Sequence, residues 1–411
     1  MILLWRMYSP IMPYQFSQLK LSLITFTLIF GSVVVNSSMD MHAPVLPEIG
    51  AFFNTTETLT QWTVSSFFLG TAIAALFYGP LADCYGRKRL LLIGISFFAC
   101  ASIWCAVAHD IYELIIARFF QGVGGVASSV IWLTIIKDIF KGKDSVRTLN
   151  VFNITISISL SAAPIAGSII ADYFGWRGIF AVLSIFGMIQ VILIAFIIPE
   201  TLKQREEQAI SVFRAFTHYK VLFSNRVFLV FAVLNGMIHG LHVAQIPLLS
   251  IHLQEVMNMS RESFALYQFI PTFFYAISAA FVRQYVKDSG LYATIRIGMI
   301  LILGYVVSLL IVQGFFSDSV NWMVLTYCIY TVCCPFIATV VTTKAMEIFH
   351  TMGGTSSSAV TSIRQLMASF ITFSAAAVYN KTFQSITIVL IAFVSLIIVA
   401  FLTHRKEIEA H

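Results

Sequence analysis

Apolar stretches of about twenty residues, separated by short polar breaks, recur along the whole chain. A helix of about twenty residues spans a bilayer, whereas a strand of a membrane barrel is about ten residues long and alternates strictly between apolar and polar positions. Each stretch therefore predicts one transmembrane helix. The predicted spans are 20–39, 61–82, 90–108, 113–136, 148–171, 178–199, 226–250, 264–285, 292–314, 320–343, 356–378 and 383–403.

The composition agrees with this pattern. Of 411 residues, 58% are hydrophobic and only 11% are charged, whereas soluble domains are about one-quarter charged. The polar surface is too small to cover a water-soluble globule, and backbone groups in hydrocarbon must bond internally. We therefore predict an all-α integral membrane protein of twelve transmembrane helices.

The longest polar stretch divides the predicted spans into two sets of six. We predict an N-terminal six-helix bundle over 1–199, a cytoplasmic linker over 200–225 and a C-terminal six-helix bundle over 226–411. The equal division suggests two parallel repeats related by a pseudo-two-fold axis. Apolar residues at near-helical spacing predict an amphipathic surface helix within the linker. They are Phe213, Phe216, Tyr219, Leu222 and Phe223.

The basic residues set the expected orientation. Most of the 25 Lys and Arg residues fall in loops on the side of the amino terminus, and Arg177, Arg261 and Lys381 fall on the other side. Acidic residues divide almost evenly, so the bias lies in the cations alone, as the positive-inside rule expects. Both termini are therefore predicted to be cytoplasmic. The same rule accounts for the net charge of +6 without a nucleic-acid partner.

A charged loop joins the second and third predicted spans. Gly79 and Gly86 permit a tight turn and close helix approach. Asp83 can accept from a helix amino terminus, and Arg87 can reach Asp138 at the end of the fourth span. Charge contacts that close one conformation and break in another form a gate, whereas the alternative is a simple topology anchor. The run reads Gly79, Pro80, Leu81, Ala82, Asp83, Cys84, Tyr85, Gly86, Arg87, Lys88 and Arg89.

That run resembles the hallmark loop of the major facilitator superfamily, G-x-L-a-D-r-x-G-R-[KR]. Residues 118–125, beginning with Arg118, resemble the second motif of the family, R-x-x-x-G-x-G-G. The resemblance implies two six-helix bundles that move small molecules by alternating access. An arginine inside the bilayer costs several kcal/mol unless it faces a cavity or a partner.

The acidic partner expected for Arg118 is Asp40, which follows the first predicted span directly and is the one acid that sits plausibly within the membrane. Its run, 38–47, resembles the T-D-M-Y-L-P-A-L-P run of Bcr/CflA-type drug exporters, with Ser38 for Thr and His42 for Tyr. A buried carboxylate that alternates between two sides can carry a proton, so we predict Asp40 and Arg118 as a proton-coupling pair. The alternative is that Asp40 is solvated and merely caps the first helix.

Three further runs extend the resemblance. Pro164 and Gly167 match the G-P-x-x-G-G part of a motif in the fifth span of exporters and predict close helix packing, although Ala163 and Ser168 replace its other glycines and weaken the antiporter implication. Residues 199–202 also agree with the Bcr/CflA group. So do Gly354, Thr355, Ser356, Ser357, Ser358 and Arg364, which are similar to its G-T-A-S-S run and arginine.

Polar residues in the second half are candidates for cargo binding. His239 and His242 lie three apart on one helix face with Gln245 nearby. They could bind cargo or relay protons, or they could simply be satisfied by neighbouring helices. Arg364 and Lys344 would favour anionic cargo, although Lys344 could instead reach the cytoplasm.

We expect a proton-coupled exporter of a small amphipathic molecule in the bacterial inner membrane. Its partners would be cargo, protons and lipid, and we expect a monomer with no cofactor and no metal. The alternatives are an uptake symporter, an exporter of a particular metabolite or siderophore, and a receptor that transports nothing. No phosphate-binding loop or nucleophile arrangement is found in the sequence, so we predict that the protein is not an enzyme.

Overall fold

The computed structural model describes residues 17–202, 217–349 and 353–404, and the regular structure of these ranges is helical. In chain order the helices are α1 (Gln18–Asp40), η2 (Ala43–Val45), α2 (Leu46–Phe52), α3 (Glu57–Tyr85), α4 (Arg87–Val107), α5 (Ile111–Ile139), α6 (Gly142–Ile197), α8 (Arg226–Ile251), η3 (His252–Val256), α9 (Arg261–Phe315), α10 (Val320–Glu347), α11 (Gly353–Val378) and α12 (Phe383–Thr403).

Two of the helices are folded back on themselves. α6 bends at Gly175 (φ 65°) and α9 bends at Gly290 (φ 80°). These positive φ values are costly for any residue with a Cβ, which explains a glycine at each bend. The backbone is not helical at either glycine, so α6 and α9 each consist of two helices that meet at a kink and correspond to two predicted spans.

Within the described residues, nine helical segments are long and apolar enough to cross a membrane. Two of the nine, α6 and α9, each contain two spans, and α11 adds a further membrane-length helix whose many Ser and Thr residues lower its hydropathy. The prediction of twelve spans in an all-α fold is therefore confirmed. Large apolar side chains such as Phe196 and Phe315 remain exposed on the outer surface, as expected for contact with lipid.

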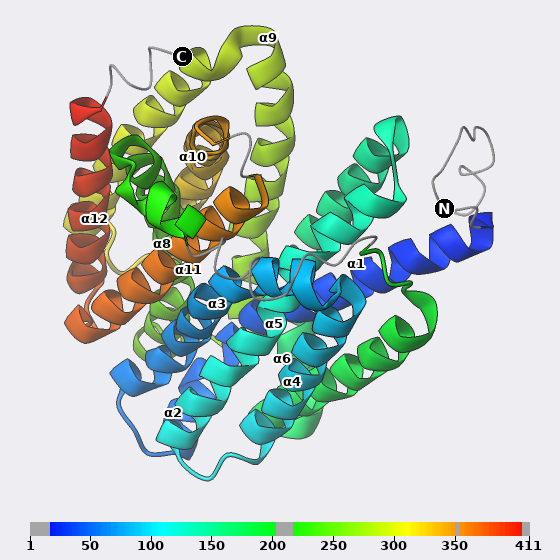
Figure 1. Cartoon of the computed structure of the whole chain (residues 1–411). Helices are drawn as coiled ribbons and strands as arrows, with labels where there is room; N and C mark the ends of the chain where they lie inside the picture. The colour runs from blue at the N-terminus through cyan, green and yellow to red at the C-terminus, as the bar shows by residue number, and fades with distance from the viewer. Residues whose placement is uncertain (1–16, 203–216, 350–352, 405–411) are drawn as a thin grey trace.

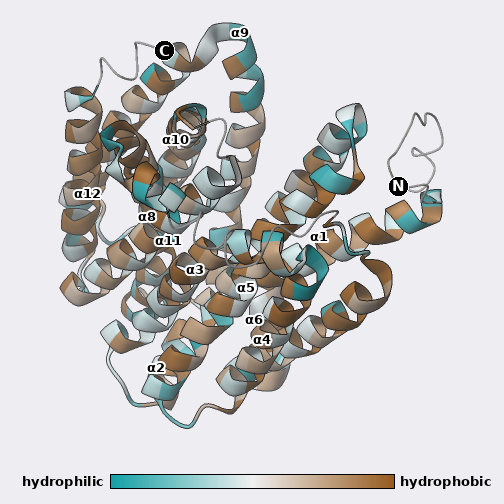
Figure 2. Cartoon of the chain, viewed as in Figure 1, coloured by the Kyte–Doolittle hydropathy of each residue, from teal (hydrophilic) through white to brown (hydrophobic). Residues whose placement is uncertain are grey.

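The helices form two bundles. α1 to α6 make the first half and α8 to α12 make the second, and each half encloses its own buried apolar core. Figure 1 shows the blue-to-green bundle beside the green-to-red bundle, with α3 next to α11. Figure 2 shows hydrophobic residues along most of each helix and hydrophilic residues around the α9 bend.

The two ends of this bundle pair differ in their connections. One end carries the α3–α4 turn at Gly86 and the α9 bend at Gly290, and we call it the Gly86 end. The other carries the α6 bend at Gly175 and the α11–α12 connection at 379–382, and we call it the Gly175 end. Helices alternate in direction between these two ends (Figure 1).

The linker between the halves is described only in part. Residues 217–224 are helical, and Tyr219 and Leu222 are buried. The Tyr219 hydroxyl donates to the Leu76 carbonyl of α3 at 2.9 Å. The other predicted apolar positions, Phe213 and Phe216, lie outside the described residues, so the linker helix and the boundaries of the two bundles stay predictions.

Candidate transport site and its charged clusters

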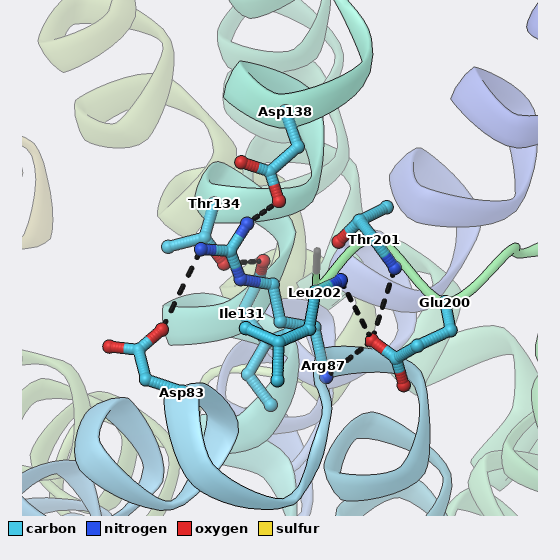
Figure 3. Close-up of polar contacts among 8 residues, drawn as sticks. All are labelled: Asp83, Arg87, Ile131, Thr134, Asp138, Glu200, Thr201 and Leu202. Carbon is cyan, nitrogen blue, oxygen red and sulfur yellow. Dashed lines mark hydrogen bonds and ion pairs between the residues drawn. The ribbon is translucent and has the colours of Figure 1, made fainter. Parts of the chain in front are cut away.

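A charged cluster occupies the Gly86 end of the first half. Figure 3 shows the Arg87 guanidinium between two acids: it pairs with Asp138 of α5 and lies 3.6 Å from the Asp83 carboxylate of α3. The Arg87 side chain is largely buried, whereas that of Asp83 is more than half exposed. The contact between Arg87 and Asp138 that the sequence predicted is thus present, and it stays within the first half.

The cluster includes an acid whose role the sequence analysis did not assign. Oε1 of Glu200 accepts the backbone N–H groups of Arg87 (2.9 Å), Thr201 (3.1 Å) and Leu202 (3.2 Å), as Figure 3 shows. Glu200 therefore satisfies the start of α4 and carries charge of the favourable sign there. Gly86 has φ 100°, and a Cβ at this position would overlap the Glu200 carboxylate. The signal in the sequence was an acid directly after the sixth span.

Gly79 lies where the two halves approach each other. A Cβ at Gly79 would stand only 2.8 Å from the Ser358 hydroxyl of α11. The approach continues along α3, because the Ser362 hydroxyl of α11 donates to the Ala72 carbonyl at 2.7 Å. Small side chains on α3 and α11 therefore let these helices run in contact between the halves.

Ion pairs join the halves at the Gly175 end. Arg261, at the start of α9, lies 2.7 Å from Glu48 of α2 and also pairs with Asp172 of α6. Lys381 of the second half lies 2.5 Å from Glu57 of α3. The sequence analysis did not predict these pairs, although it marked Arg261 and Lys381 as exceptions to the cation bias.

Hydrogen bonds reinforce the same end. The Ser250 hydroxyl of α8 donates to the Ala43 carbonyl at 2.5 Å, and the Thr58 hydroxyl of α3 donates to the Ala376 carbonyl of α11 at 3.1 Å. The short helices η2 and α2 contact both α8 and α9. The Gly175 end is therefore closed in this conformation.

Arg118 is completely buried in the first half. Its guanidinium donates to the Gln121 side-chain oxygen at 2.5 Å and to the Thr63 carbonyl at 3.3 Å, and it lies 4.6 Å from the centroid of the Phe67 ring. No ion pair between Arg118 and Asp40 is formed in the described part of the chain. Neutral oxygens and an aromatic face take the place of the carboxylate that the sequence predicted.

His42 occupies the space beside Arg118. This histidine is fully buried, its Nε2 lies 3.4 Å from the Thr63 hydroxyl, and its ring centroid is 5.6 Å from that of Phe180. The sequence analysis noted His42 only as a departure from the family run. It is the polar residue of that run that neighbours Arg118.

Asp40 lies at the end of α1 and is partly exposed. Among the described residues it has neither a hydrogen bond nor an ion pair, and it lies within electrostatic range of Tyr327 from the second half. A Cβ at Gly167 would overlap the Met41 carbonyl, so α6 packs directly on the turn that follows Asp40. Pro164 lies about one turn earlier in α6. The Pro164–Gly167 segment thus positions the Asp40 turn.

The two histidines of α8 lie at the interface of several helices. His239 Nε2 is 3.2 Å from the Gln365 side-chain oxygen of α11, and its ring contacts Phe68 of the first half. His242 Nδ1 is 3.3 Å from the Tyr327 hydroxyl, and its ring stacks on Tyr275 of α9 at 5.5 Å. Both histidines are partly exposed, so the structure brings them together as the sequence predicted and leaves each with accessible surface.

Gln245 does not share this position. It is 2% exposed, its amide nitrogen donates to the Leu241 carbonyl at 3.1 Å, and its oxygen accepts from the Tyr305 hydroxyl at 3.0 Å. Its polar atoms are therefore used inside the second half, and no surface is left for cargo. Arg364 of α11 is partly exposed and lies within electrostatic range of His239.

The chain belongs to the Major Facilitator Superfamily, which residues 3–372 match. Among its relatives is an uncharacterized MFS-type transporter, YdgK, of Bacillus subtilis, which is 29% identical over 245 residues (59% of this chain and 61% of the relative). Another is a bicyclomycin resistance protein homolog of Haemophilus influenzae, which is 30% identical over 185 residues (44% of this chain and 46% of the relative). The matched region thus spans about half the length of these relatives.

Solved structures agree on the fold. A crystal structure of a D-xylose-proton symporter covers 93% of this chain, and the chain covers 97% of it, with a TM-score of 0.74 and 15% sequence identity. A peptide transporter solved in complex with sulfate covers 94% of the chain and is itself covered over 94% of its length, with a TM-score of 0.75. The chain therefore has the fold of these structures, with two six-helix bundles in one multi-pass membrane protein.

Proposed function

We propose that this transporter exports a small amphipathic molecule in exchange for protons. The observation that carries the proposal is Asp40, a carboxylate between the halves that has no counter-ion among the described residues. An ionised carboxylate inside a membrane protein is costly unless it is paired or hydrated. Asp40 therefore changes protonation as its surroundings alternate between water and protein, which is what a proton carrier requires.

The pair first predicted for coupling takes a modified form. Asp40 carries the proton, while Arg118 acts at a distance through the positive field of a buried guanidinium held by Gln121 and Thr63. His42 stands on the same side of the first half as Arg118 and adds a polar group to that wall. The coupling groups thus all belong to the first half.

Alternating access then depends on the two ends. In this conformation the Gly175 end is closed by Arg261 and Lys381, and these pairs must break to open it. At the Gly86 end we propose a gate in which the charged cluster fixes the α3–α4 turn, while Gly79 lets α3 approach α11. Its residues are Gly79, Asp83, Gly86, Arg87 and Asp138. One proton entering down about 100 mV releases roughly 2.3 kcal/mol, enough for about a fifty-fold gradient of a neutral cargo.

Export is favoured over uptake by the relatives. One is described as a bicyclomycin resistance protein homolog, and others are described as multidrug resistance proteins. Resistance by a transporter requires that the compound leave the cell. The bias in Lys and Arg favours an orientation in which the Gly86 end and both termini face the cytoplasmic side of a bacterial inner membrane.

The test uses everted membrane vesicles that respiration acidifies. Adding bicyclomycin should dissipate part of the proton gradient when the wild-type protein is present, and Asp40→Asn should abolish that response. Asp318→Asn, which removes an exposed acid in the loop before α10, is the matched control and should leave the response unchanged. Cargo-driven proton release that persists in Asp40→Asn would overturn the coupling role. Gradient-dependent accumulation of bicyclomycin in intact cells would overturn export in favour of uptake.

A further inference from the structure

Arg118, Lys344 and Arg364 are basic residues of the membrane-spanning helices, and each has a nitrogen atom that is buried without a hydrogen-bond partner. They differ in their other contacts. Arg118 is enclosed by the Gln121 oxygen, the Thr63 carbonyl and an aromatic face. Lys344 of α10 lies 3.8 Å from the Glu347 carboxylate on its own helix. Arg364 of α11 forms no ion pair with any carboxylate in the described ranges, and its Nε is buried without a hydrogen-bond partner.

The surroundings of Arg364 are polar but neutral. The side chain lies within electrostatic range of His239 and Tyr275, and these residues come from α8 and α9. His239 is bonded to Gln365, while Tyr275 stacks on His242. These groups can donate or accept hydrogen bonds, but none carries the negative charge that would neutralise a guanidinium.

We propose that Arg364, with His239 beside it and aromatic rings around it, binds the carboxylate of an organic acid with a flat apolar body. The inference rests on the transport function proposed above and names its substrate class. A guanidinium presents parallel N–H donors that match both oxygens of a carboxylate. A cation without a partner is expensive inside a membrane protein, and an anionic cargo supplies the missing charge only while it is bound.

Aromatic rings near Arg364 and His239 suit the apolar part of such a molecule. Phe68 of the first half lies edge-on to His239, with ring centroids 6.3 Å apart, and Tyr275 of the second half lies within range of Arg364. A flat apolar ring can pack on these faces while its carboxylate reaches the guanidinium. Because Phe68 and Arg364 belong to different halves, the affinity for a cargo that contacts both depends on the relative position of the halves.

The experiment measures binding to the purified protein in nanodiscs without any proton gradient. The probes are 2-naphthoate and 2-naphthamide, which share a ring system and differ in charge. We expect calorimetry to show that wild type binds the naphthoate at least about tenfold more tightly, in line with a charge-assisted hydrogen bond. Arg364→Gln should remove this preference, and Arg364→Lys should keep part of it because the charge remains without the planar fork.

Arg283→Gln is the matched control, because it removes an exposed cation of the second half that lies outside the proposed site, and it should leave the preference intact. Equal binding of both probes by wild type, or a preference that survives Arg364→Gln, would overturn the proposal. Ligand-free Arg364→Gln should be at least as thermostable as wild type, since it loses an uncompensated charge. A clear drop in its Tm would reveal an internal counter-ion and would also overturn it.

The outcome is separable from the proposed export. If naphthoate binding follows these expectations while Asp40→Asn leaves proton-coupled export intact, only the coupling assignment fails. If export is proton-coupled but the naphthoate has no advantage, only the organic-acid site fails.

Discussion

Both ends of the molecule carry clusters of an arginine and two acids. One cluster lies within a single half, and the other joins the two halves. At the Gly86 end, Arg87 pairs with Asp138 and Asp83, and all three residues belong to the first half. At the Gly175 end, Arg261 of the second half pairs with Glu48 and Asp172 of the first. The first cluster fixes the shape of one half, whereas the second holds the two halves together.

This difference separates two functions that a salt bridge can have in a transporter. A pair within one half stabilises that half and holds in place the turn that it contacts. A pair between halves exists in one conformation only and therefore biases the equilibrium between conformations. Of the three cations predicted to lie opposite the main basic face, Arg261 and Lys381 form such pairs, while Arg177 donates to the Ala106 and Ala108 carbonyls within the first half.

The largest expected effect comes from fixing the closed end covalently. Thr58 and Ala376 lie side by side across the halves, so Thr58→Cys with Ala376→Cys should form a disulfide on oxidation in a background without the six native cysteines. Because the Gly175 end can then no longer open, cargo transport into everted vesicles should fall to background. Reduction with dithiothreitol should restore it.

The control for this disulfide lies within one half. The Ser32 and Ser128 hydroxyls of α1 and α5 are 3.2 Å apart, so Ser32→Cys with Ser128→Cys places a bridge inside the first half. Oxidation of this pair should leave transport active, since the half moves as a unit. Transport that continues with a complete Thr58–Ala376 bridge would mean that the halves do not separate at this end.

The next largest effect is expected at the Gly86 end, from Arg87→Gln. The substitution leaves Asp138 without its partner in a mostly buried site, which should cost about 1–3 kcal/mol and lower the Tm of the purified protein. Transport should also be lost, because the α3–α4 turn is no longer held. Arg89→Gln removes a neighbouring exposed cation and is expected to change neither quantity. A normal Tm together with lost transport would indicate a gate contact that acts only between conformations.

The contacts at the two ends differ in how well the sequence could predict them, because they differ in how their residues are marked in the sequence. The Arg87–Asp138 contact was predictable because a continuous motif marks Arg87 and helix length places Asp138 at the same membrane face. The spans were equally accessible, since about twenty apolar residues suffice to identify each one. The bends at Gly175 and Gly290 each connect two successive spans directly, and the number of spans remains as predicted.

The contacts between halves were not predictable in the same way. Arg261 and Glu48 are far apart in the sequence, and no motif links them, so only the packing of α2 against α9 brings them together. The predicted coupling of Asp40 and Arg118 stays a prediction, because the two side chains form no ion pair in this conformation. Their charges suggested a partnership, but in this conformation the guanidinium donates to Gln121 and Thr63 instead, and residue contacts inside a helix bundle depend on rotations that hydropathy does not determine.

A smaller effect is expected from Arg261→Gln, which should shift the conformational equilibrium without unfolding either half. Glu48 and Asp172 would then face each other without a cation, which destabilises the closed Gly175 end by about 1–2 kcal/mol, a factor of roughly 5–30 in population. Spin labels at Ala51 and Asp318 should show longer distances by double electron–electron resonance, and labels at Lys141 and Ser289 should show shorter ones. Arg177→Gln, which alters only contacts within the first half, should leave both distributions unchanged.

The smallest effect is expected from Lys381→Gln, because the Lys381 side chain is 56% exposed and water screens its pair with Glu57. The loss should be about 1 kcal/mol or less and should fade as salt is raised, whereas the effect of the more buried Arg261 should persist. The hydrogen bond that the Lys381 ammonium donates to the Glu57 carboxylate raises the pKa of Lys381. While Glu57 is ionised, the pair contributes fully below about pH 10.4 and is lost as the pH rises through the raised pKa of Lys381. A distance change between Ala51 and Asp318 that is already complete at pH 8 in wild type would show that Lys381 does not hold this end.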